Sequence, residues 1–219
     1  MVKAPREAID LKGVRCVIFD LDGTLVDSEP VTSRALLDLL PDLHDDEDAL
    51  VARYRGRQMA FVLADIEQRL KRSLPANFEE LYRGRVDDLF ATQLKQMPGA
   101  ADMLSALRLP QGIASSGPMA KIRRSLSLTG LSGFFGGRLY SSYDINSWKP
   151  DPGLFLHAAD RMGFAPDACL VVEDSDVGIS AALAAGMSVV RYDPIGRSAA
   201  ADGVTTIRAL PELLALLNT

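Results

Sequence analysis

The chain has 219 residues and a net charge of -5, and 47% of its residues are hydrophobic. This length suits one large domain, or one domain with a small insert, and leaves room for a sizeable core. The acidic balance argues against a general polyanion-binding surface, so we expect no nucleic-acid partner, although one local basic pocket for a phosphate is compatible with it. No apolar run approaches the length of a membrane span, and the polar N-terminus does not resemble a signal peptide. We therefore expect a cytoplasmic protein with no membrane partner.

The two cysteines, Cys16 and Cys169, fall in apolar, strand-like runs. We expect them to be buried, reduced thiols, because no Cys-x-x-Cys pair is present. The two histidines, His44 and His157, are far apart and lie in no ligand-spaced cluster. A zinc site is therefore not expected.

The first predicted strand ends in two aspartates. Residues 16–19 are all apolar, which is typical of a parallel strand buried on both faces. Asp20 and Asp22 follow, and Gly23 lets the chain turn away. Open α/β sheets bind ligands at this end of their strands, and two close carboxylates repel each other unless a cation lies between them. The alternative interpretation of either aspartate is a helix cap or a turn residue.

The stretch from residue 31 to residue 97 predicts helices and no strand. Apolar residues recur there at helical spacing. The expected helices lie around residues 36–40 and at 45–54, 59–70 and 78–94. A compact helical insert after the first strand is the simplest account. We expect a helical domain at 28–96 and a core domain built from 1–27 and 97–219.

Strands and helices alternate after this insert. The predicted strands lie at 112–116, 138–141, 169–174, 188–191 and 204–207, and the predicted helices at 100–107, 119–129, 153–162, 175–185 and 210–217. Such alternation predicts an α/β fold with a doubly wound parallel sheet, in a Rossmann-like arrangement.

Polar side chains follow three of the predicted strands. They are Asp20 and Asp22, Ser115 and Ser116, and Glu173 and Asp174, to which a loop adds Lys149. Because parallel strands end at one edge of a sheet, these groups can converge. Four close carboxylates favour a hard cation, and Mg²⁺ suits oxygen ligands. A lysine and serine hydroxyls would bind a phosphate beside it.

These motifs resemble those of a known family. Residues 20–24 (Asp-Leu-Asp-Gly-Thr), Ser115, the Lys149-Pro150 pair and the acidic pair at 173–174 match, in order and spacing, the four motifs of the haloacid dehalogenase-like (HAD) superfamily. The match spans nearly the whole chain, and the insert resembles that family's small cap domain. The branch it most resembles contains β-phosphoglucomutases and sugar-phosphate phosphatases. Residues 143–152 are similar to a loop of 6-phosphogluconate phosphatases.

The resemblance implies a role for each acidic residue. Asp20 would be the nucleophile that forms an aspartyl-phosphate, and Asp22 would protonate the leaving oxygen and then accept a proton from water. Mg²⁺ would be held by Asp20, the backbone carbonyl of Asp22 and Asp174, with Glu173 binding directly or through water. Ser115, the amide of Ser116 and Lys149 would hold the phosphoryl group.

A turn between two insert helices carries Arg55, Gly56 and Arg57. One interpretation is a solvated turn with two charges. The other is a loop that enters the active site, with Arg55 or Arg57 facing the substrate, and the sequence leaves both open. Residues 27–29 and 96–99 would then form two hinge strands between cap and core.

The expected function is Mg²⁺-dependent hydrolysis of a small phosphorylated metabolite, a sugar phosphate or sugar-acid phosphate, by a monomer or weak dimer. A phosphomutase with the same core is the main alternative. Mutases of this branch carry a histidine twelve residues after the nucleophile, where this chain has Thr32. A phospho-receiver module would carry its acceptor and its acidic pair on different strands. A haloacid dehalogenase would not need a metal and would lack the second aspartate of the first motif. Asp174 and Asp22 therefore argue against a dehalogenase.

Overall fold

A computed structural model describes residues 11–196 and 203–217. Within these residues, six strands form one parallel sheet in the order β3-β2-β1-β4-β5-β6. They are β1 (Cys16–Phe19), β2 (Gln111–Ser115), β3 (Leu139–Ser141), β4 (Cys169–Glu173), β5 (Ser188–Tyr192) and β6 (Thr205–Ile207). Each predicted strand is confirmed to within one residue at either end. The predicted doubly wound α/β fold is therefore confirmed.

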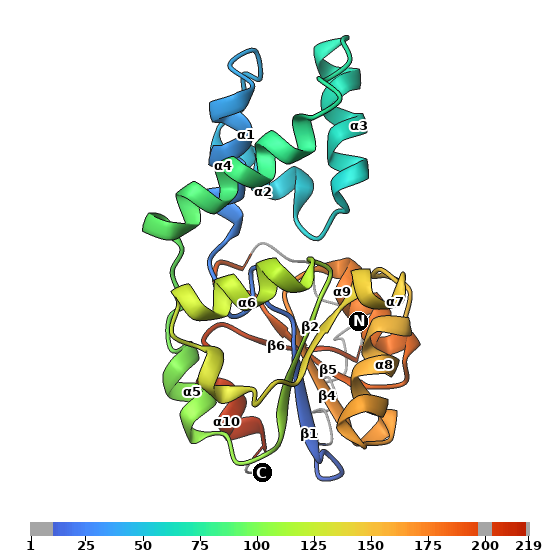
Figure 1. Cartoon of the computed structure of the whole chain (residues 1–219). Helices are drawn as coiled ribbons and strands as arrows, with labels where there is room; N and C mark the ends of the chain where they lie inside the picture. The colour runs from blue at the N-terminus through green and yellow to red at the C-terminus, as the bar shows by residue number, and fades with distance from the viewer. Residues whose placement is uncertain (1–10, 197–202, 218–219) are drawn as a thin grey trace, which may run out of the picture.

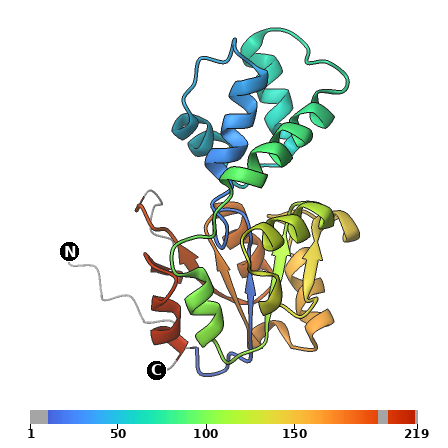
Figure 2. The ribbon, with the colours of Figure 1, turned by 60° about the vertical axis from the view of Figure 1, so that its left-hand side comes forward.

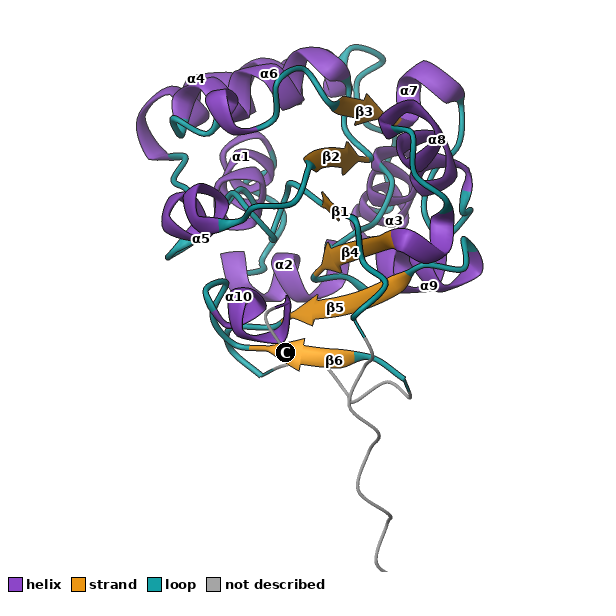
Figure 3. Ribbon diagram, turned by 90° about the horizontal axis from the view of Figure 1, so that it is seen from below, coloured by secondary structure: helices purple, strands orange, loops and turns teal. Residues whose placement is uncertain are grey.

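Helices cover both faces of the sheet, as Figure 3 shows. On one face lie α5 (Ala100–Ala106), α6 (Met119–Leu128) and α10 (Glu212–Leu217), and on the other α8 (Gly153–Met162) and α9 (Asp176–Ala184). Successive residues of β1 point to opposite faces. Val17 and Phe19 therefore belong to the hydrophobic core on the face covered by α5, α6 and α10. Cys16 and Ile18 belong to the core on the face covered by α8 and α9. Cys16 and Cys169 are both buried and free, as expected, and are paired in register across β1 and β4.

Four helices form an insert between β1 and α5. They are α1 (Glu29–Leu39), α2 (Glu47–Tyr54), α3 (Met59–Leu70) and α4 (Phe78–Gln93), and we call them the helical insert. Figures 1 and 2 show the helical insert above the carboxyl edge of the sheet. The segments that enter and leave it lie side by side, because Val26 bridges Gln96 in antiparallel fashion. Among the described residues, no helix has the length and apolar character that crossing a membrane would require.

Side-chain caps explain where some helices differ from the sequence prediction. The helix predicted from residue 45 begins at Glu47, because the side chain of Asp46 accepts a hydrogen bond from the amide of Ala49 at 2.7 Å. The helix predicted from Ser175 begins one residue later, since Ser175 is itself the N-cap. A short helix, α7 (Ser142–Ile145), was not predicted, and it follows β3 directly.

Candidate active site

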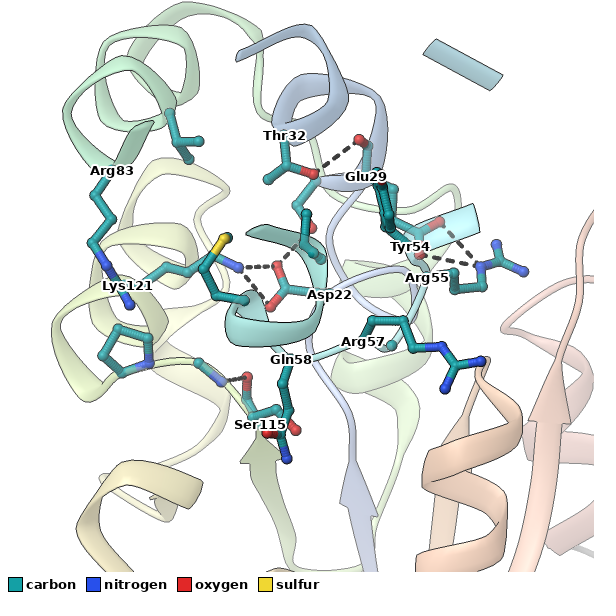
Figure 4. A pocket seen from close by; sticks show the side chains of 18 of the residues that line it. Asp22, Glu29, Thr32, Tyr54, Arg55, Arg57, Gln58, Arg83, Ser115 and Lys121 are labelled. Carbon is teal, nitrogen blue, oxygen red and sulfur yellow. Dashed lines mark hydrogen bonds and ion pairs between the residues drawn. The ribbon is translucent and has the colours of Figure 1, made fainter. Parts of the chain in front are cut away.

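The carboxyl ends of β1, β2 and β4 meet beneath the helical insert. Residues of both the sheet edge and the insert line a cavity of about 930 Å³ there. Figure 4 shows this cavity from close by, with Ser115 at the end of β2 and insert side chains above it. The fold thus brings the predicted site residues of the core and the turn at 55–57 to one place.

Three carboxylates gather at the ends of β1 and β4. Ligand atoms of Asp20, Glu173 and Asp174 all lie within 4.8 Å of one another, and all three residues are buried. The adjacent ends of these two strands place them together, because Phe19 pairs with Val172 in the parallel register. In the structure these three acidic groups therefore lie close together, as the sequence predicts.

Lys149 lies between two of these carboxylates. Its Nζ atom donates to Asp20 Oδ1 at 2.5 Å and to Glu173 Oε1 at 2.8 Å. Burial lowers the pKa of Lys149, but the two carboxylates outweigh burial and raise its pKa above the ordinary value. The ammonium therefore stays charged and holds both acids in place.

The carboxylate cluster is electrostatically unfavourable without a further cation. Burial, and then the charges of Glu173 and Asp22, raise the pKa of Asp20 to about 7, although Lys149 opposes this. Burial, followed by the charges of Glu173 and Glu29, raises the pKa of Asp174 well above its ordinary range. A divalent cation among these groups would stabilise their ionised forms.

The oxygens left without donors are the ones that fit such a cation. Thr24 Oγ1 donates to Asp174 Oδ1 at 2.9 Å, whereas the buried Asp174 Oδ2 has no hydrogen-bond partner. Both oxygens of Glu173 are occupied, one by Lys149 and the other by the amide and hydroxyl of Ser175. The donor set, oxygen atoms of buried carboxylates, therefore fits a hard divalent cation.

Asp22 lies beside the cluster, but its carboxylate is bound by side chains outside the cluster. Asp22 accepts a hydrogen bond from Ser28 Oγ at 2.6 Å, and Lys121 Nζ lies 2.8 Å from both of its oxygens. Burial raises the pKa of Asp22, but Lys121, with the hydrogen bond of Ser28 and the charge of Lys149, more than offsets burial and lowers the pKa overall. The sequence analysis missed Lys121, because nothing in its local sequence shows that the first turn of α6 brings it to Asp22.

The two serines predicted at the end of β2 also border the cavity. Ser115 is buried, and its Oγ atom accepts a hydrogen bond from the amide of Gly117 at 3.1 Å. Ser141 Oγ donates to the carbonyl of Gly117 at 2.7 Å, which fixes the turn between β2 and α6. Ser116 lies in this turn, so a hydroxyl and backbone amides border the same cavity as Lys149.

The two arginines of the turn at 55–57 have different surroundings. Arg55 Nε donates to both carboxylate oxygens of Glu29 and lies 3.2 Å from Asp174 Oδ2. Arg57 is exposed, and its guanidinium lies over the ring of Phe61 at 5.0 Å from the centroid. Both arginines line the cavity, but Arg55 already has acidic partners within the protein.

Comparison with known proteins identifies the family. The model of the haloacid dehalogenase-like hydrolases matches residues 14–186, which is most of the chain. The chain belongs to this family. The expected enzyme class and the resemblance drawn from the motifs are thereby confirmed.

Relatives of the chain include proteins named as phosphatases. The chain is 33% identical over 205 residues to 6-phosphogluconate phosphatase of Escherichia coli (strain K12), covering 91% of this chain and 93% of that protein. It is 31% identical to hexitol phosphatase A of the same organism, covering 81% and 83%. A crystal structure of a HAD family hydrolase from Deinococcus radiodurans R1, with bound phosphate and sodium, is 29% identical with a TM-score of 0.78, covering 95% and 96%.

Proposed function

We propose that this HAD-like hydrolase is a Mg²⁺-dependent, cytoplasmic phosphatase that hydrolyses a small phosphorylated sugar or sugar acid. The observation that carries the proposal is the buried trio of Asp20, Glu173 and Asp174, joined by Lys149, at the floor of a cavity covered by the helical insert. The similarity to phosphatases whose names specify phosphogluconate and hexitol substrates supports the substrate class.

In this proposal Asp20 attacks phosphorus. The attack forms a bond between an aspartate oxygen and phosphorus, and the bond to the substrate oxygen breaks. Asp22, whose carboxylate lies beside the cluster, protonates that leaving oxygen, so that a free alcohol departs. For this step Asp22 must carry a proton, which requires its contact with Lys121, the contact that lowers its pKa, to open first. Water then attacks the aspartyl-phosphate, Asp22 takes one proton from the water, and inorganic phosphate leaves Asp20 as a carboxylate.

The remaining core residues hold the group that is transferred. Lys149 and the hydroxyl of Ser115 would bind the phosphoryl oxygens, with the amide of Ser116 in the same turn. Asp20 and Asp174 offer the free carboxylate oxygens for Mg²⁺, together with the backbone carbonyl of Asp22. A bound Mg²⁺ would neutralise charge on the phosphoryl oxygens and on the carboxylates. Because Glu173 already accepts three hydrogen bonds, we expect it to act on the ion through water.

The helical insert would select the substrate. We propose residues 28–96 as a cap domain and residues 1–27 with 97–219 as the catalytic core, noting that 1–10, 197–202 and 218–219 lie outside the described residues. The turn with Arg55, Gly56 and Arg57 reaches the cavity from the insert, which supports its assignment as a specificity element.

A panel of phosphate esters tests this function. Purified protein with Mg²⁺ should release phosphate from gluconate 6-phosphate or a hexose or hexitol phosphate, and excess chelator should abolish the release until Mg²⁺ is restored. An Asp20→Asn protein purified in parallel controls for host phosphatases. Full activity after exhaustive chelation would refute the metal-dependent mechanism.

The same panel separates a phosphatase from a phosphomutase. Thr32 lies in the first insert helix and borders the cavity, where its hydroxyl donates to the carbonyl of Glu29 at 2.9 Å. A threonine cannot carry a proton near neutral pH as an imidazole does. With a hexose 1-phosphate and a trace of bisphosphate, we expect free phosphate and little hexose 6-phosphate. Hexose 6-phosphate appearing well ahead of phosphate would favour the mutase.

A further inference from the structure

Arg55 carries a positive charge from the helical insert to a carboxylate of the predicted metal site. Its Nε atom lies 3.2 Å from Asp174 Oδ2 and 3.1 and 3.2 Å from the two carboxylate oxygens of Glu29. The side chains are 19% exposed for Arg55, 15% for Glu29 and 3% for Asp174. The Nε–H group donates to Glu29, so Asp174 Oδ2 receives the charge of the guanidinium without a hydrogen bond.

The oxygen that Arg55 approaches is also the oxygen that a metal ion needs. Asp174 Oδ1 accepts the hydrogen bond of Thr24, which leaves Oδ2 free to bind a cation. A divalent ion shared by Asp20 and Asp174 would therefore face the guanidinium across a single carboxylate oxygen. Like charges this close repel each other, and the repulsion is stronger in a largely buried site than in water.

We propose that Arg55 is a positioning residue that competes with the divalent cation for Asp174, and that Glu29 limits this competition by holding Arg55. The inference rests on the metal dependence of the proposed function. It gives Glu29, at the start of α1, a role that neither step of the phosphatase reaction assigns to it.

The competition links the metal site to the turn that lines the cavity. Gly56 follows Arg55 with a φ of +69°, and a Cβ atom placed there would lie 2.9 Å from the Cβ of Ser175. The turn therefore rests on the residue that follows the acidic pair of β4. A cation on Asp174 weakens the hold of the core on Arg55, and by linkage a turn that is drawn away from the core strengthens cation binding.

Mg²⁺ affinity measured by isothermal titration calorimetry, at one pH and one ionic strength, tests the proposal. Arg55→Gln removes the competing charge, so we expect Mg²⁺ to bind roughly tenfold more tightly. Arg55→Lys keeps a positive charge and should bind Mg²⁺ with an affinity closer to that of the wild type. Arg57→Gln is the matched control, because it removes the same charge at a position two residues along the turn. Within the described part of the chain, Arg57 forms no ion pair, whereas Arg55 forms two. Its affinity should stay within about twofold of the wild type.

Glu29→Gln should have the opposite sign to Arg55→Gln. The amide of this variant keeps one acceptor oxygen but no negative charge, so it holds Arg55 less tightly and the guanidinium can bind Asp174 more strongly. Mg²⁺ should therefore bind several-fold more weakly. The double variant separates this route from the charge of Glu29 itself. If Glu29 acts through Arg55, Glu29→Gln changes the affinity little in the Arg55→Gln background.

Two results would overturn the proposal. One is equal Mg²⁺ affinity in the wild type and Arg55→Gln, a comparison that is decisive even if Glu29→Gln fails to fold. The other is an equal loss from Glu29→Gln in both backgrounds. Failure of the wild-type protein to bind millimolar Mg²⁺ is a different outcome, because it would refute the metal-dependent phosphatase and the competition together.

Discussion

The two walls of the cavity are built from different kinds of contact. On the sheet side, Asp20, Lys149 and Glu173 are nearly inaccessible to solvent, and each is held by a side chain from a different segment of the core. On the insert side, Arg57 and Gln58 are exposed, and the guanidinium of Arg57 lies over the ring of Phe61 in α3.

The difference separates two tasks. A buried network of paired charges holds those charges at fixed positions, which is what stabilisation of a developing charge requires. Exposed side chains on a turn can change without disturbing the fold, and they suit selection among substrates. We therefore expect substitutions at the sheet edge to affect the reaction and the stability of the protein, and substitutions at exposed positions of the insert turn to affect selectivity.

The largest expected effect comes from removing the nucleophile. Asp20→Asn keeps the shape of the side chain but cannot attack phosphorus, so kcat should fall at least about a thousandfold. Phosphate release and circular dichroism measure the two properties separately. Asp102→Asn, the same change at an exposed position of α5, should leave kcat unchanged. Near-normal turnover by Asp20→Asn would contradict the assignment.

Removing the buried ammonium should affect both activity and stability. Lys149→Met leaves the carboxylates of Asp20 and Glu173 facing each other without a cation. Breaking a buried ion pair in this way typically destabilises a protein by about 3–5 kcal/mol. Denaturant unfolding measures the change, with the exposed Lys95→Met as control. A normal unfolding midpoint for Lys149→Met would show that the sheet-side network does not stabilise the fold.

A third substitution should raise stability while it removes function. Burial raises the pKa of Asp174 in the metal-free protein. An acid whose folded-state pKa exceeds its unfolded value loses stability as pH rises between the two values, because the unfolded state ionises first. Asp174→Asn removes that loss, so the variant should melt several degrees higher than the metal-free wild type at pH 8 and less so at pH 5. Thermal melts of both proteins at pH 8 and pH 5 measure this difference. A lower melting temperature for Asp174→Asn than for the metal-free wild type at pH 8 would contradict the prediction.

The smallest effect is expected on the insert side. Gly56→Ala places a Cβ atom against Ser175 and Val177 at a φ of +69°, which strains the turn and moves it from the core. We expect kcat/KM for a sugar phosphate to fall several-fold, with little change for a small aryl phosphate. Gly163→Ala is a matched control, since Gly163 has a φ of +81° and no atom within 4 Å of an added Cβ. Equal losses on both substrates would place the turn in the chemistry and not in selection.

Local sequence was enough to predict the sheet edge. An apolar run followed by acids marks β1 and β4, and a strand ending in hydroxyls marks β2, because parallel strands all end at one edge. Asp20, Ser115 and Glu173 therefore could be assigned to one site before their separation in space was known. The helices were equally predictable, since α3 of the insert and α8 of the core repeat apolar residues at helical spacing.

Contacts between distant helices could not be predicted in this way. Lys121 of α6 approaches Asp22, 99 positions earlier in the chain, and Arg55 approaches Glu29 because two insert helices converge. These distances depend on helix positions that no local pattern specifies. Thr24 is a similar case, because its sequence context indicates a turn residue while its hydroxyl fixes one oxygen of a carboxylate 150 positions away.

The paired crossings between the core and the helical insert bear on how this architecture diversifies. The amide of Asp27 donates to the carbonyl of Lys95 at 2.9 Å, and the amide of Met97 donates to the carbonyl of Leu25 at 2.8 Å. The chain thus leaves the sheet and returns to it at a single point, so the strand order does not depend on what lies between. Recombination between relatives could exchange the intervening segment as a cassette, and a new substrate range could arise without any rearrangement of the strands that hold the reacting groups.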